Sequence, residues 1–151
     1  MKTFFFVVVL VAVAGVLWIR LAPIDRDRWQ VDPAEAEDPK RSGVRYIGRE
    51  APRFPGDPET VLSTFDDIAS EEPRTRLLEG DLDEGMLTYV TRSRVFGFAD
   101  FVTVKAVSEG SLTKLSIVSR ARVGPKGYDW GVNAERLDRW LQDMRLRLGQ
   151  G

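Results

Sequence analysis

Residues 86–107 read MLTYVTRSRVFGFADFVTVKAV, and the fold follows from this stretch. Two strand-like runs, Met86 to Val95 and Phe101 to Val107, have only residues 96–100 between them, and alternate positions in each, such as Leu87 and Tyr89 or Val102 and Val104, are apolar. Alternation with a period of two is typical of strands that bury one face. A connection this short joins strands that run antiparallel. We therefore predict an antiparallel pair here, as the two middle strands of a sheet.

Two further strand-like runs flank this pair, Arg74 to Glu79 before it and Leu112 to Arg122 after it. A helix is expected before the strands, because Asp57-Pro58-Glu59 supplies an N-cap, a proline for the first helical position and an acidic residue at the positive end of the dipole. A second helix is expected after them, with Asn133 as its N-cap. The apolar stripes of these helices are Val61, Leu62, Phe65, Ile68 and Ala69, and Leu137, Trp140, Leu141, Met144 and Leu148. The prediction is an α+β fold in the order α-β-β-β-β-α, with a four-stranded antiparallel sheet and two helices on one face.

The chain begins with an apolar segment. After Lys2 and Thr3, the run from Phe4 to Ile19 carries no charge. Extended to residue 22, with Arg20 reaching toward the headgroups, it approaches the roughly 20 residues that a helix needs to cross a bilayer. We predict a transmembrane signal anchor over residues 1–22. The alternative is a cleaved signal peptide, but cutting after the one small-x-small triplet, residues 12–14, leaves an apolar new N-terminus.

The residues on the two sides of this single span favour opposite orientations in the membrane. Arg20, Arg26 and Arg28 lie on the C-terminal side of the span, and a count of basic residues keeps that side in the cytoplasm. A three-residue start with one lysine is instead typical of a signal anchor that exports the C-terminal part of the chain. We favour export, which places the domain on the periplasmic or extracytoplasmic side of the membrane.

Residues 23–57 differ in composition from the remainder of the chain. Six of the eight prolines lie between Pro23 and Pro58, with scattered charges and few apolar residues. This composition indicates a Pro-rich charged linker or an irregular wrap. Trp29 and Val31 are candidates to dock on the domain, and residues 44–47 are a candidate edge strand. The α+β domain itself is expected over residues 58–151.

Composition excludes several kinds of chemistry. Basic and acidic residues balance, 22 against 23, so nothing in the net charge favours nucleic acid as a partner. Histidine and cysteine are both absent. Ser-His-Asp and Cys-His arrangements, imidazole metal sites and zinc-thiolate sites are therefore impossible. We predict no metal, no cofactor and no catalytic residue, and an enzyme is not the favoured interpretation.

Strand alternation assigns the side chains to two faces of the sheet. The face toward the helices is expected to carry Leu87, Tyr89, Val95, Val102, Val104, Ala106, Leu115, Ile117 and Ala121. The opposite, open face is expected to gather basic residues, including Arg74 and Arg76. The candidate anion-binding residues there are Arg92, Arg94, Arg120, Arg122 and Lys105. Guanidinium forks bind phosphate or carboxylate bidentately. The alternative is that these residues only solvate a half-covered sheet.

A glycine-rich connection, residues 119–133, joins the last strand to the last helix. Gly124 and Gly131 permit left-handed turns, and Asp129 is placed to accept hydrogen bonds from nearby backbone amides. A purely structural role accounts for these residues. A helix N-terminus beside Arg120 and Arg122 would also attract an anion.

The same residues carry a resemblance to a known family. The pattern consists of Arg92-Ser93-Arg94, Gly97-Phe98, Asp100-Phe101-Val102, Ser119-Arg120-x-Arg122-x-Gly124 and Asp129-x-Gly131-x-Asn133-x-x-Arg136, with Arg28-Trp29 and Asp32-Pro33 upstream. It resembles the domain-of-unknown-function 1499 family over about residues 28–148, although the connection at residues 125–128 is slightly longer than in the family. The resemblance implies a bacterial-type or plastid-type domain that often lies behind a membrane segment, and it implies no activity. The motif residues taken from it are Asp100, Gly124, Asp129, Gly131, Asn133 and Arg136.

Three functions fit the sequence. The first is a membrane-anchored cell-envelope module that binds an anionic or amphiphilic ligand, such as an anionic lipid or a metabolite, on the basic sheet face. The second is a structural or assembly protein that docks a partner protein through that face. The third, a histidine-free hydrolase using Asp100 or Asp129, ranks well behind because paired carboxylates must face each other across a cleft.

Overall fold

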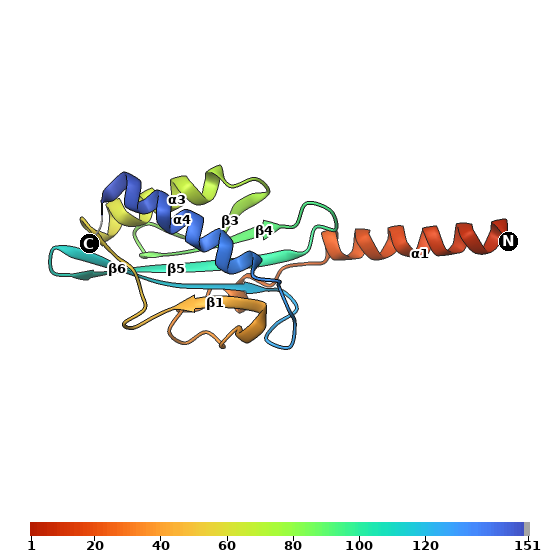
Figure 1. Ribbon diagram of the computed structural model, residues 1–151, viewed down its shortest axis with the longest axis horizontal. Coiled ribbons are helices and arrows are strands. Elements are labelled where there is room, and N and C mark those ends of the chain that lie inside the picture. The colour runs from red at the N-terminus through yellow and green to blue at the C-terminus, as the bar shows by residue number, and fades with distance from the viewer. Residues whose placement is uncertain (150–151) are drawn as a thin grey trace.

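A computed structural model describes residues 1–149 of the chain. Within that range the protein has four α-helices, one short 3-10 helix and six strands (Figure 1). The helices are α1 (Lys2–Leu21), α2 (Arg26–Trp29), α3 (Pro58–Glu71) and α4 (Val132–Leu148), and the 3-10 helix is η1 (Lys40–Ser42). The strands are β1 (Gly43–Tyr46), β2 (Arg53–Pro55), β3 (Thr75–Asp81), β4 (Met86–Arg92), β5 (Ala99–Glu109) and β6 (Leu112–Ala121).

The strands form one antiparallel sheet in the order β1-β6-β5-β4-β3, and β2 also pairs with β6. The four predicted strands are present as β3 to β6, but the predicted total of four is wrong. β5 covers only one edge of β6, and unpaired N–H and C=O groups on the other edge need partners. β1 takes that edge from Ile117 to Arg120, and β2 takes it from Leu112 to Lys114. β2 has only three residues and ends in a proline that only an edge strand tolerates, so no alternation marks it in the sequence.

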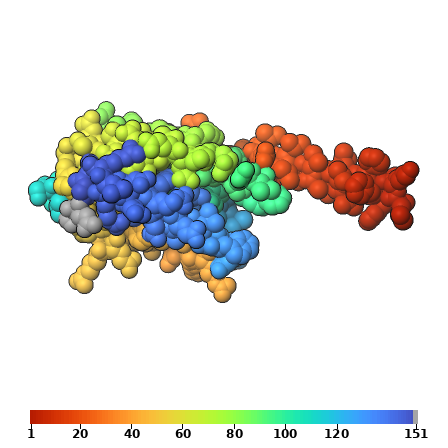
Figure 2. Space-filling model, turned by 45° about the horizontal axis from the view of Figure 1, so that its top comes forward, coloured from red at the N-terminus to blue at the C-terminus, as the bar shows by residue number. Residues whose placement is uncertain are grey.

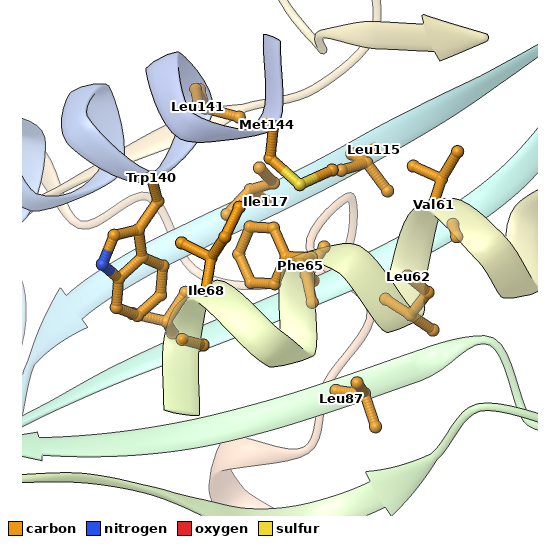
Figure 3. Close-up of a cluster of buried hydrophobic side chains, with 14 of the residues drawn as sticks. Val61, Leu62, Phe65, Ile68, Leu87, Leu115, Ile117, Trp140, Leu141 and Met144 are labelled. Carbon is orange, nitrogen blue, oxygen red and sulfur yellow. The ribbon is translucent and has the colours of Figure 1, made fainter. Parts of the chain in front are cut away.

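One face of the sheet carries the main core. Figure 1 shows α3 and α4 lying side by side across that face. Their apolar stripes pack on the strand side chains predicted to face them, including Leu87, Val104 and Ile117 (Figure 3). α3 begins as expected, because the Asp57 carboxylate accepts a hydrogen bond of 2.9 Å from the Thr60 amide. The α+β architecture with α3 and α4 on one face of the sheet is confirmed.

Val95 is the exception to the predicted alternation. β4 ends at Arg92, and residues 93–98 form a loop closed by a bond of 2.8 Å from the Ser93 amide to the Phe98 carbonyl. Val95 stands in that loop with 67% of its surface exposed, not against the helices. The alternation fails here because the polypeptide turns before the apolar pattern ends.

The second face of the sheet is covered, not open as predicted. The segment after α1 crosses beneath the sheet, on the side away from α3 and α4 (Figure 1). Its anchor is Trp29, whose ring stacks on Phe101 with centroids 3.7 Å apart and planes 11° apart. The Trp29 carbonyl accepts hydrogen bonds from the Thr103 hydroxyl and the Arg120 guanidinium. A second apolar cluster of Trp29, Leu78, Val90, Ala99 and Phe101 results.

The position of Trp140 gives a stability prediction. Its ring is 2% exposed and packs edge-on against Phe65 and Tyr89, and its indole N–H donates to Glu72. Trp140→Ala should lower the free energy of unfolding by about 3–5 kcal/mol, because a large cavity replaces these contacts. Leu146→Ala, on the exposed side of α4, is the control and should change it by less than about 0.5 kcal/mol. Chemical denaturation that gives similar losses for both variants would contradict the helix orientation.

Candidate functional site

Five arginines line one cavity at the end of the domain next to α1. Arg20 comes from the last turn of α1, Arg74 immediately precedes β3, and Arg76 lies in its first residues. Arg92 comes from the end of β4 and Arg94 from the 93–98 loop. The cavity has a volume of about 390 Å³, and Thr75, Val90, Ser93 and Gly97 complete its lining. We call it the arginine pocket. In Figure 2 the loop between β4 and β5 (green) lies beside the base of α1, which extends to the right.

Backbone pairing places three of these arginines. The Arg92 amide donates to the Arg74 carbonyl at 3.1 Å, and the Arg74 Nε donates to the Arg92 carbonyl at the same distance. The β3–β4 ladder continues with Arg76 opposite Val90. Arg74 occupies the left-handed region with φ 60°, a conformation that non-glycine residues rarely adopt outside turns and functional sites. The ladder therefore sets Arg74, Arg76 and Arg92 around one opening.

The 93–98 loop brings in the arginine from α1. Arg20 donates to the Val95 carbonyl at 2.9 Å, and Arg92 donates to the Gly97 carbonyl at 3.0 Å. Gly97 has φ 76°, and a Cβ added to it would lie 2.7 Å from Cγ of Arg20. Only glycine lets the loop adopt this backbone while the Arg20 side chain packs on it. The pocket therefore depends on contact between α1 and the loop.

The charged side chains that line the pocket are all positive. None of the five arginines forms an ion pair with a carboxylate within residues 1–149, and no acidic side chain in that range lines the cavity. Burial, together with the positive charges of Arg76, Arg122 and Arg20, lowers the pKa of Arg92. Arginine stays charged even so. An anion entering the pocket would relieve this repulsion and gain guanidinium hydrogen bonds.

The structure divides the predicted anion-binding residues into separate environments. Arg92 and Arg94 line the arginine pocket. Lys105 forms an ion pair with Asp32 of the N-terminal segment. Arg122 donates to the carbonyls of Ala22 and Pro23, at 3.3 and 2.7 Å. These last two basic residues hold the segment after α1 on the domain.

Arg120 is enclosed beside Trp29. Its guanidinium carbon lies 5.0 Å from the ring centroid of Trp29, and burial lowers its pKa. It borders a smaller cavity of about 180 Å³ with Arg28, Glu37 and Gly124. Through the cation–π contact with the Trp29 ring and the hydrogen bond to the Trp29 carbonyl, Arg120 holds the N-terminal segment against the sheet.

The family-motif residues form a second constellation, a buried polar network at the start of α4. Arg136 is 5% exposed and donates to Asp100 at 3.0 Å and to Asn133 at 3.1 Å. The Asn133 amide nitrogen donates to Asp129 at 2.9 Å, and the Ser119 hydroxyl donates to the Asn133 carbonyl oxygen. The network thus joins β5, β6 and α4. Its carboxylates serve as acceptors for neighbouring groups.

Asn133 is not the N-cap that the sequence predicts. Gly131, with φ 80°, is the capping residue, and Asn133 lies fully buried in the first turn. The Asp129 carboxylate instead accepts from the backbone amides of Gly131 and Asn133, at 3.0 and 3.2 Å. Asp129 therefore satisfies the first amides of α4 and frees Asn133 to bind within the network. Gly124, with φ 73°, turns the chain after β6.

Sequence reasoning missed Arg20, Arg74 and Arg76 as members of one site. The sequence places Arg74 and Arg76 on the correct face with the other arginines, and their alternation with Thr75 is the one local signal. For Arg20 the sequence predicts only a position at the end of the apolar helix. Its proximity to the 93–98 loop is a tertiary contact that no local pattern encodes.

Comparisons with known proteins give a family and no relative of known structure. The sequence model of one family, described as "Protein of unknown function (DUF1499)", matches residues 27–144. The match covers most of the chain, so the chain belongs to this family, as the resemblance suggested. No curated protein and no solved structure matches it.

The buried network predicts a pH-dependent stability. Burial raises the pKa of Asp100, and the charge of Arg136 opposes that rise. A carboxyl group whose pKa is raised by folding holds its proton more tightly in the folded state, so stability falls as the pH rises above the unfolded value of about 3.8. Arg136→Met should raise the pKa of Asp100 further and cost about 3–5 kcal/mol near neutral pH, where the buried carboxylate is left unpaired.

Denaturation curves at several pH values test this. The loss caused by Arg136→Met should be smallest in acid and grow toward neutral pH. Arg136→Met combined with Asp100→Asn should remove the additional pH dependence, because the titrating group is gone. Equal losses from Arg136→Met at all pH values would mean that Asp100 does not titrate in this range.

Proposed function

We propose that this member of the DUF1499 family is a membrane-anchored, non-catalytic binding module of the cell envelope that holds an anionic, phosphate-bearing ligand in the arginine pocket. The observation that carries the proposal is the convergence of five arginines on one cavity without an acidic neighbour among the described residues. Guanidinium groups bind phosphate bidentately, and pockets of this size accommodate small ligands. The site replaces the broad basic sheet face that the sequence suggests, because the N-terminal segment covers that face.

The position of the pocket favours a lipid headgroup as the ligand class. α1 is long and apolar enough to span a bilayer, and none of its residues is buried in the domain. A 20-residue helix is about 30 Å long, close to the hydrocarbon thickness of a bilayer. Arg20, at its end, would then stand at headgroup level, and the pocket it lines would open beside the phosphates. We propose α1 as an uncleaved anchor on this basis.

The pocket also bears on the alternative of a docked partner protein. Protein interfaces place apolar anchors at their centre and charges at the rim. Arg76 and Arg94 are exposed, and Val90 is the only large apolar side chain among the described residues that line the cavity. This lining suits a small anion better than a protein surface.

The decisive variant is Arg76→Gln combined with Arg94→Gln. Neither side chain makes a hydrogen bond or ion pair to another residue within the described chain, so stability should stay within about 0.5 kcal/mol of wild type. Binding of short-chain phosphatidic acid to the full-length protein in neutral detergent should weaken at least about tenfold, because each charge-assisted hydrogen bond contributes about 1.5–3 kcal/mol. Isothermal titration calorimetry measures this directly.

The control is Arg49→Gln combined with Arg145→Gln, which removes the same charge from exposed positions outside the pocket. It should bind as wild type does. Competition by inorganic phosphate distinguishes a phosphate site from one that needs the acyl chains. Equal weakening in both double variants would indicate a diffuse charge effect and would overturn the pocket as the site.

We also propose that the domain lies on the extracytoplasmic side of the membrane. The chain has no cysteine, so Ser108→Cys, at an exposed position near the end of β5, introduces one thiol at the hairpin that lies far from α1 (Figure 1). A membrane-impermeant maleimide should label it in intact cells stripped of any outer membrane. Labelling only after cell lysis would place the domain in the cytoplasm.

A further inference from the structure

Two loops concentrate the exposed aromatic side chains of the domain. Within residues 22–149, the exposed aromatic residues are Phe96 and Phe98 in the 93–98 loop, and Tyr128 and Trp130 in the connection of residues 122–131 between β6 and α4. Val95 and Val123, 67% and 62% exposed, extend the two groups. Monomeric soluble proteins rarely expose apolar side chains in such clusters without a partner.

Both loops adjoin the point where α1 leaves the domain. Arg20 donates to the Val95 carbonyl of the 93–98 loop, and Arg122, at the start of the 122–131 connection, donates to the carbonyls of Ala22 and Pro23. Figure 1 shows both loops at the end of the domain from which α1 projects, opposite the β5–β6 hairpin. The two loops therefore share the environment of the C-terminal end of α1.

The loops present their aromatic rings as formed pairs. The Phe96 and Phe98 rings have centroids 5.8 Å apart, and Tyr128 and Trp130 meet edge to face at 5.2 Å. Trp130 is 78% exposed and adopts a left-handed backbone with φ 55°. Non-glycine residues rarely adopt this conformation, and Trp130 is exposed here whereas Trp29 and Trp140 are buried. Tyrosine and tryptophan favour the membrane interface, where one end of the ring is apolar and the other is hydrated.

Charge in the loops matches an anionic bilayer surface. Arg94 and Lys126 are exposed beside the aromatic pairs. The only carboxylate in the two loops, Asp129, is bonded to the amides of Gly131 and Asn133. Basic residues next to interfacial aromatic side chains are the combination that attracts a protein to anionic lipids.

We infer that the 93–98 loop and the 122–131 connection sit in the interface of the bilayer that α1 crosses. The aromatic pairs enter the boundary between headgroups and acyl chains, and Arg94 and Lys126 lie at the phosphates. The inference rests on the proposed membrane anchor and is independent of the ligand in the arginine pocket. Its consequence is that the domain is held in one orientation on the membrane, with the pocket opening at headgroup level.

The absence of cysteine permits a test with single nitroxide labels on the full-length chain. Val95→Cys and Lys126→Cys place labels in the two loops without removing an aromatic ring. Val9→Cys, within α1, gives the reference for the bilayer interior, and Ser108→Cys gives the reference for water. The protein is reconstituted in vesicles of phosphatidylcholine with phosphatidylglycerol as the anionic component. Collision rates of each label with oxygen and with a water-soluble nickel chelate are then measured by electron paramagnetic resonance.

We expect the labels at positions 95 and 126 to lose nickel collisions and gain oxygen collisions relative to position 108. Adding Phe96→Ser and Trp130→Ser should return both labels toward the values at position 108. Adding Val107→Ser and Leu146→Ser, which are exposed apolar positions outside the loops, should change neither label. Loop labels as exposed to nickel as position 108, with position 9 protected, would overturn the inference and leave the anchor intact. Nickel access at position 9 would overturn the anchor itself and with it this inference.

Discussion

The stack of Trp29 on Phe101 fixes the N-terminal segment, and the rest of the arrangement depends on it. A sheet with helices on one face leaves its second face exposed, and here the chain must cover that face with a segment of little regular structure. Trp29 does so with a ring buried to 5% exposure and a carbonyl that accepts from Thr103 and Arg120. Once Trp29 is seated, the few residues between it and Leu21 require α1 to end beside the 93–98 loop. Arg20 lines the arginine pocket because α1 ends there.

The arginines of this chain show how tertiary structure gives one residue type different roles. Arg136 is buried against a carboxylate and joins α4 to β5, whereas Arg120 and Arg122 hold backbone carbonyls and an aromatic ring of the N-terminal segment. Arg76 and Arg94 stand beside other guanidinium groups without an acidic partner among the described residues. Since the net charge of the whole chain is close to zero, the positive potential of the pocket comes from separation of charge within the fold.

The buried network at the start of α4 is structurally linked to the two loops that carry the exposed aromatic side chains. Hydrogen bonds of Asp129 to the Gly131 amide and to the Asn133 side chain fix the end of the 122–131 connection, and with it the backbone that carries Tyr128 and Trp130. The residues that mark the family in the sequence thus shape the end of the domain that adjoins α1. The hydrogen bond from Arg136 to Asp100 connects this network to β5, which follows the 93–98 loop.

The sequence by itself determined the apolar helix at the N-terminus, the four strands β3 to β6, the two helices on one face and the family. Each of these rests on a local or periodic pattern, such as the alternation in residues 86–107 or the stripe around Trp140, and burial of one face is enough to enforce it. It also identified Arg92 and Arg94 as candidates for anion binding. It also marked residues 44–47 as a candidate edge strand and Trp29 as a candidate to dock on the domain, and both are confirmed. Only the tertiary structure decided that β2 extends the same sheet edge, that Trp29 covers the second face, and that Arg20 joins Arg74 and Arg76 at one cavity. These features depend on contacts between residues that are far apart in the chain. A single packed ring or a three-residue strand produces no periodic pattern of apolar residues from which it could be predicted.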